Sequence, residues 1–127
     1  MATKRKWTKA QQKAHRHLLV KALRSGKYRQ ARAQLRTDDG AMCCLGVACH
    51  ISGLSRWRRV GEDLLAYGKK GEARDDRLTE VVREWLGFAT CRGNMRAGRS
   101  LAVLNDRGAT FSEIADIIES EPEGMVE

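Results

Sequence analysis

The polar and apolar positions of residues 8–25 predict an amphipathic helix near the start of the chain. Thr8 with Gln11 three places later has the pattern of a capping box, and Gly26 is suited to end the helix. At about 100° per residue, an apolar side of this helix is expected to face the core. That side consists of Trp7, Ala14, Leu18 and Ala22. The opposite side is expected to be exposed and carries one sign of charge, on Lys9, Lys13, Arg16, Arg24 and Lys27.

A second helix is predicted over residues 78–87. Its apolar residues recur at i, i+3, i+4, i+7 and i+8, which is the spacing of one helical face. Asp75 or Asp76 can cap its start, and Gly87 can end it.

The last part of the chain predicts two more helical pieces. A short turn of helix over residues 101–105 stops at the sequence NDRG. Thr110 with Glu113 then has the pattern of another capping box, which starts a helix over residues 111–119. The apolar face of that helix is formed by Phe111, Ile114, Ile117 and Ile118.

Strand signals are weaker. Residues 28–36 alternate between apolar and polar, which predicts a short exposed strand, and Asp39-Gly40 favours a hairpin turn. Residues 55–77 are interpreted as a polar surface excursion with a short helix over 60–67. We therefore expect an α+β fold: a small, mostly antiparallel sheet or hairpin from the 28–51 region, packed as a single layer pair against about three to five helices. The expected core contains Trp85, Leu86, Ile114, Ile117, Leu18 and Leu45.

The length of 127 residues indicates one domain over 1–127, with a flexible basic arm at 1–7 and an acidic, frayed tail at 120–127. The formal net charge is +8, and it is unevenly distributed. Residues 1–36 carry twelve Lys or Arg and no Asp or Glu, whereas residues 37–127 carry twelve Lys or Arg and sixteen Asp or Glu. Such an asymmetry points to a polyanionic partner. No signal peptide or membrane span is evident, so a cytoplasmic protein without a membrane partner is expected.

The stretch AMCCLGVACH, residues 41–50, contains three of the four cysteines. In a helix, Cys43 and His50 would lie about 10.5 Å apart along the axis, and in a strand Cys43 and Cys49 would lie about 20 Å apart. Neither geometry chelates one ion, and no charge lies in residues 41–49 to activate a thiol. We interpret Cys43, Cys44 and Cys49 as buried apolar residues, with Gly46 allowing a close approach of another element. No metal and no cofactor is expected.

Two more specific functions are weighed and set aside. The sequence LNDRGATFSEIADIIES resembles the first two pieces of a helix-turn-helix, but the next residues are acidic and terminal, where a basic recognition helix would be needed. His15, His17 and Asp106 belong to no catalytic constellation, so no catalytic residue is assigned and an enzyme is not expected.

Three blocks of the sequence together resemble a group of small phage and prophage proteins. They are the block around CCLGV, the block REWLGF, and the block LAVLNDRGATFSEIADIIE, found in residues 26–54, 78–88 and 101–119. The resemblance covers about half of the chain and carries over no catalytic or binding residue. It implies a phage accessory protein that acts in the bacterial host cytoplasm.

Two functions remain open at this point. The first is a non-enzymatic protein that binds nucleic acid or another polyanion through a basic face of its N-terminal helix. The alternative is a phage inhibitor of a host defence or nucleic-acid-processing complex, acting on an acidic host protein or by sequestering a signalling nucleotide. The oligomeric state is left open. The candidate polyanion-binding residues are Lys9, Lys13, Arg16, Arg24, Lys27, Arg29, Arg32, Arg56, Arg58 and Arg59.

Overall fold

The structure, a computed structural model, describes residues 7–62 and 64–127. Within these residues, five α-helices and three short strands form a small α+β fold, as expected. The elements are α1 (Lys9–Arg24), β1 (Arg36–Thr37), α2 (Cys44–Ser52), β2 (Trp57–Arg59), β3 (Leu64–Tyr67), α3 (Glu80–Leu86), the 3₁₀ turn η1 (Arg96–Gly98), α4 (Leu101–Asp106) and α5 (Phe111–Ser120). The predicted basic arm at 1–7 lies outside the described residues except for Trp7, which packs against the core.

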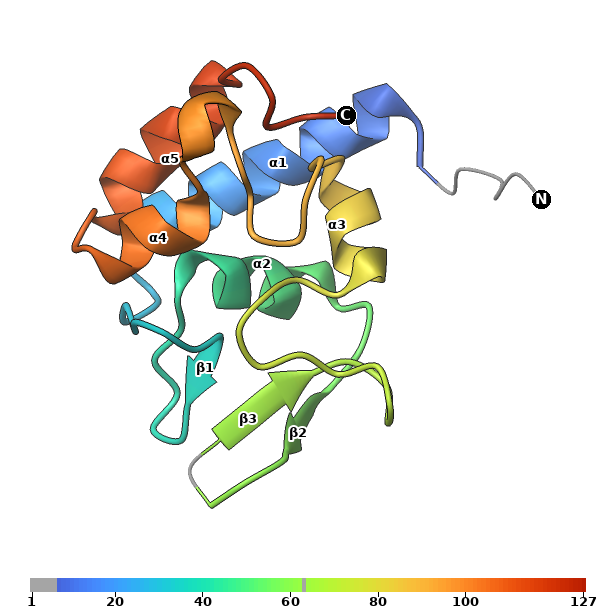
Figure 1. The fold of residues 1–127 in the computed structure, drawn as a ribbon, viewed down its shortest axis with the longest axis vertical. Helices are drawn as coiled ribbons and strands as arrows, with labels where there is room; N and C mark the ends of the chain where they lie inside the picture. The colour runs from blue at the N-terminus through green and yellow to red at the C-terminus, as the bar shows by residue number, and fades with distance from the viewer. Residues whose placement is uncertain (1–6, 63) are drawn as a thin grey trace.

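Helix α2 lies in the middle of the molecule (Figure 1). It packs against α1, α3 and α4, and α1 also packs along α5. The open sheet lies on the other side of α2 and has the antiparallel order β1-β3-β2. In its register, Arg36 and Arg59 both pair with Leu65, from opposite sides of β3. The helices therefore enclose the core, and the sheet closes one end of it.

The sheet does not come from the region that the sequence pattern favoured. Of residues 28–51, only Arg36–Thr37 is strand, whereas β2 and β3 belong to the presumed surface excursion. The prediction of a helix over residues 60–67 is wrong, since Leu64–Tyr67 is β3. The turn at Asp39-Gly40 is confirmed, because the Thr37 N–H donates to Ala41 O at 2.8 Å across it.

The cysteine stretch forms α2, and its cysteines are buried as predicted. Cys43, Cys44 and Cys49 have exposed fractions of 6%, 1% and 0%. Gly46 allows the expected close approach, because a Cβ there would lie 1.9 Å from the carbonyl oxygen of Leu35. Any side chain at Gly46 would push α2 away from the chain that leads into β1.

The predicted helix ends are mostly confirmed. Both capping boxes, at Thr8 and at Thr110, are formed. Gly87 ends α3 in the left-handed conformation with φ 75°. The N-cap of α3, however, is Thr79, whose hydroxyl accepts from the Val82 N–H, and not an aspartate.

The inward face of α1 differs from the predicted one. Its buried residues are Gln12, Arg16, Leu19, Val20 and Leu23. Leu18, which was assigned to the core, is 51% exposed. The other core residues are found as expected, with Leu45, Trp85, Leu86 and Ile114 buried and Ile117 partly buried against them.

The C-terminal tail is packed and not frayed. Met125 is fully buried in the core, and its carbonyl accepts from the Ala89 N–H at 2.8 Å. Val126 forms a bridge with Phe88, so the tail runs beside the end of α3. The sequence suggested fraying because the tail is acidic, but the buried Met125 and the backbone contacts of the tail with Phe88 and Ala89 hold it in place.

Asn105, at the NDRG turn, organises the chain between α1 and α2. Its amide nitrogen donates to Ala31 O at 2.7 Å, and its carbonyl oxygen accepts from the Cys44 N–H at 3.1 Å and from Gln30 at 2.9 Å. Because Cys44 is the first residue of α2, its N–H has no partner inside the helix. The fully buried Asn105 therefore caps α2 and fixes the preceding loop at the same time.

We predict that Asn105→Ala lowers the free energy of unfolding by about 2–6 kcal/mol, because two buried backbone groups lose their partners at about 1–3 kcal/mol each. Urea unfolding measures the change. Val103→Ala is the control on the same helix, where the side chain is 44% exposed, and should stay within about 0.5 kcal/mol of wild type. Equal stability of the two variants would contradict the capping role.

Candidate functional site

Three polar side chains on the inward face of α1 bind the last three carbonyls of α3. Gln12 donates to Glu84 O, His15 to Trp85 O and Arg16 to Leu86 O, each at 2.7 Å. A carbonyl oxygen only accepts, so Nδ1 of His15 carries the proton in this contact. The final carbonyls of a helix have no partner within it and carry the negative end of the helix dipole, which favours a cation such as Arg16. These residues are therefore turned inward although they are polar.

The aromatic part of the same contact strengthens it. The His15 ring stacks on Trp85 at 4.1 Å between centroids, with 7° between the planes. Trp7 meets His15 edge to face at 5.0 Å. Glycine at position 87 leaves space for the Gln12 side chain, since a Cβ at this position would lie 2.9 Å from it.

Arg16 is buried, which corrects the prediction that it is free to meet a partner. Its exposed fraction is 5%, and its second guanidinium nitrogen donates to Glu121 at 2.7 Å. This hydrogen bond is the main cause that lowers the pKa of Glu121, with smaller contributions from the charges of Lys13 and His17. Arg16 therefore joins α1 to both α3 and the C-terminal tail.

Other predicted cations are also engaged within the molecule. Arg24 pairs with Asp116 at 2.6 Å and with Glu119 at 3.2 Å, both on α5. The sequence pattern showed one sign of charge on this side of the helix, but these carboxylates come from another helix. In the loop that follows α1, Arg29 pairs with Asp39 at 3.2 Å.

The arginines in and next to the sheet differ in their contacts. Arg59 pairs with Asp38, and Arg58 donates to Gly68 O at 3.0 Å. Arg56, just before β2, is exposed, and no ion pair is formed by its side chain within the described residues. This group is separate in the fold from α1, so the ten predicted residues do not form one surface.

The basic side chains of α1 that are exposed and form no ion pair among the described residues make a single ridge, which we define as Lys9, Lys13, His17 and Lys21. The four residues are spaced four apart, so they form a slanted row that rises about 6 Å per step and about 18 Å in all, and that turns by about 120° around the helix from Lys9 to Lys21. Within the described part of the chain, none of the three lysines has a carboxylate within ion-pair distance. Sequence reasoning missed His17 and Lys21, and the i, i+4 spacing was the signal that could have found them.

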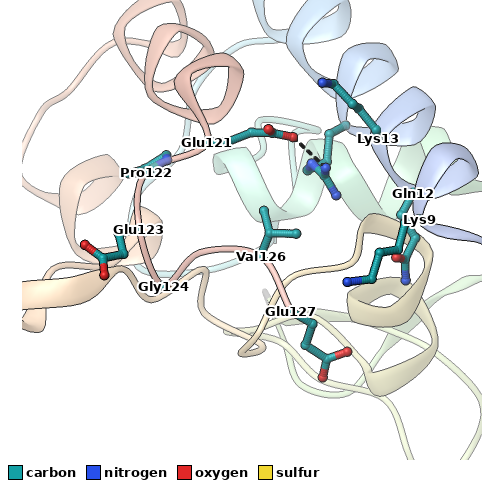
Figure 2. A pocket seen from close by; sticks show the side chains of 10 residues that line it. Lys9, Gln12, Lys13, Glu121, Pro122, Glu123, Gly124, Val126 and Glu127 are labelled. Atoms are coloured by element: carbon teal, nitrogen blue, oxygen red, sulfur yellow. Dashed lines mark hydrogen bonds and ion pairs between the residues drawn. The ribbon is translucent and has the colours of Figure 1, made fainter.

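A cleft of about 410 Å³ lies between the start of the ridge and the C-terminal tail (Figure 2). Gln12, Arg16 and the tail residues 121–124 line it together with Lys9 and Lys13. The Glu121 carboxylate pairs with Arg16 at 2.7 Å. In Figure 2 the side chains of Glu123 and Glu127 point away from Glu121. Glu123 pairs with Arg96 and Glu127 with Arg83, which leaves the two lysines on the rim without either of these carboxylates.

The cysteine thiols are poor nucleophiles in this environment. Burial raises the pKa of Cys43 to about 11 and raises the pKa of Cys44 and Cys49 as well. Burial and the neighbouring Glu80 raise the pKa of Cys91 to about 11. No group of three or more metal-ligating side chains occurs in residues 7–62 and 64–127, and the metal content of the protein stays a prediction.

The chain belongs to the DUF8296 family, described as a domain of unknown function, which matches residues 10–122. A search of curated proteins and a search of solved structures each gave no match. Among the described residues, no helix is both long and apolar enough to cross a bilayer.

Arg16→Gln and Lys13→Gln form a matched pair of variants that removes the same charge one turn apart. We predict that Arg16→Gln lowers the free energy of unfolding by about 2–4 kcal/mol, because Leu86 O and Glu121 both lose a buried partner. Lys13→Gln should change it by less than about 0.5 kcal/mol. Urea unfolding at neutral pH measures both. Equal effects would show that α1 is rotated relative to the arrangement described here.

Glu121 should make stability depend on pH. Its pKa is lowered in the folded protein, so its contribution is complete above the usual glutamate pKa and is lost as the pH falls below it. We expect the free energy of unfolding to fall less steeply between pH 5 and 3 in Glu121→Gln than in wild type. Glu72→Gln, at an exposed position, should keep the wild-type slope. Identical slopes in all three proteins would show that the Arg16–Glu121 contact adds nothing.

Proposed function

We propose that the protein is a non-enzymatic, phage-type accessory protein that binds nucleic acid through the ridge on α1. The single observation that supports this proposal is the line of Lys9, Lys13 and Lys21, exposed and without described carboxylate partners. Lysines in such a line act as point charges that neutralise backbone phosphates and release counterions. Binding of this kind is weakly dependent on sequence and strongly dependent on salt.

The sequence extends the positive charge beyond the ridge. Lys4, Arg5 and Lys6 precede α1 and lie outside the described residues. Because they are adjacent to Lys9 in the chain, they can add phosphate contacts at the same end of the ridge. The proposed surface thus combines a rigid helical part with an adjoining basic segment.

The α4–α5 pair does not suit reading of DNA bases. A recognition helix presents basic or neutral residues to the major groove. The exposed side of α5 instead carries Glu113, Asp116 and Glu119, which would repel phosphates. Its other side is packed against α1. These features favour contact with the nucleic-acid backbone by α1 over operator recognition by α5.

Electrophoretic mobility shifts of a mixed-sequence DNA duplex and an RNA of equal length, each at several salt concentrations, test the proposal. Wild type should bind at low salt. On the duplex, the triple variant Lys9→Gln/Lys13→Gln/Lys21→Gln should reduce the slope of log affinity against log salt by up to about 3, at about 0.9 per phosphate contact. The triple Lys69→Gln/Lys70→Gln/Arg74→Gln removes the same charge elsewhere and should reduce the slope less. Deletion of residues 1–6 measures their part separately.

Absence of any shift at low salt would overturn nucleic-acid binding, and so would equal losses in the two triple variants. In the first case an inhibitor that binds an acidic host protein becomes the leading interpretation of the ridge. Urea unfolding of both triple variants ensures that a loss of binding is not a loss of fold.

A further inference from the structure

His17 differs from the other members of the ridge because the charge of a histidine depends on pH near neutrality. It lies four residues after Lys13 and four residues before Lys21 on α1, so it is the neighbour of both lysines on the helix surface. Histidine changes its charge between about pH 5 and 8, whereas lysine stays charged throughout that range. The ridge therefore combines three fixed charges with one charge that varies with pH.

The His17 side chain is free to contact a partner. It is exposed, and it forms no hydrogen bond and no ion pair with any described residue. The other two histidines are engaged within the molecule. Nδ1 of His15 donates to Trp85 O, and Nδ1 of His50 accepts from the Trp57 indole at 3.3 Å. Of the three, His17 is the one whose ring is available to a ligand along the ridge.

The carboxylates on this side of α1 are already paired. They come from α5 and the tail, and they are Asp116, Glu119 and Glu121. The first two pair with Arg24, and the third pairs with Arg16. The charge of His17 has only a minor effect on Glu121. Helices α2 and α3 pack on the buried side of α1, which carries Gln12 and Arg16, so their charged groups do not face His17.

From this arrangement we propose that His17 is a fourth phosphate-binding group of the ridge, and that its protonation makes nucleic-acid binding stronger as the pH falls from 8 to 5.5. This inference rests on the proposed function of the ridge. A phosphate beside the imidazole favours its charged form, and by linkage the charged form favours the bound phosphate to the same extent. The neutral ring offers no charge and releases no counterion.

Mobility shifts of the same DNA duplex at several salt concentrations, measured at pH 5.5 and at pH 8, test this inference. The phosphodiesters of the duplex keep their negative charge over this range, so a change in slope reports the protein. The slope of log affinity against log salt for wild type should be steeper at pH 5.5 by up to about 0.9, which is one phosphate contact.

Three variants assign the effect to one residue. His17→Gln should have the shallower slope of wild type at both pH values. His17→Lys should have the steeper slope at both, because its charge is fixed. The control His50→Gln removes the other exposed histidine and should keep the pH dependence of wild type. Urea unfolding at both pH values ensures that each variant is folded.

The outcomes separate this inference from the function on which it rests. Wild type that binds the duplex with the same slope at both pH values would overturn the role of His17 and leave binding by the lysines in place. A pH dependence that persists in His17→Gln, or that disappears in His50→Gln, would do the same. Absence of binding by wild type at both pH values would overturn the proposed function and this inference with it.

Discussion

The capping of α3 by α1 is the contact on which the rest of the structure depends. Gln12, His15 and Arg16 bind three successive carbonyls at the end of α3, and these contacts set the rotation of α1 about its own axis. Once that rotation is set, Leu19 and Leu23 enter the core and Lys13, a turn before His17, faces outward.

The acidic C-terminal part of the chain completes this arrangement. Glu121 pairs with Arg16, and Asp116 and Glu119 pair with Arg24, so α5 and the tail neutralise one edge of the basic helix. Met125 fixes the tail in the core. The basic residues of the N-terminal third thus have two roles. Arg16 and Arg24 pair with the acidic C-terminal part, and the lysines of the ridge stay exposed.

Local signals in the sequence predicted local features well. The capping boxes at Thr8 and Thr110, the stop at Gly87 and the close approach at Gly46 follow from a few neighbouring residues and were found. Features decided by distant residues were not. The burial of Arg16 could not be predicted, because its partner, the carbonyl of Leu86, lies 70 residues away in the sequence. The strands β2 and β3 form because they pair with each other and with β1. β2 is mostly polar and β3 is apolar throughout, so neither shows the alternation that would mark a strand. The prediction therefore assigned the candidate site to the correct helix, but some of the residues it chose lie on the wrong face of that helix.

The most direct test of the central claim is a nuclear magnetic resonance titration of the labelled protein with a short DNA duplex at low salt. The claim is that α1 is divided into an inward polar face that caps α3 and an outward ridge that binds. The backbone amide signals of Lys9, Lys13, His17 and Lys21 should shift in proportion to added duplex, while the side-chain signals of Gln12 and Arg16 stay in place. Shifts that cluster around residues 69–77, or shifts of the Gln12 and Arg16 side chains that indicate release from α3, would contradict the account.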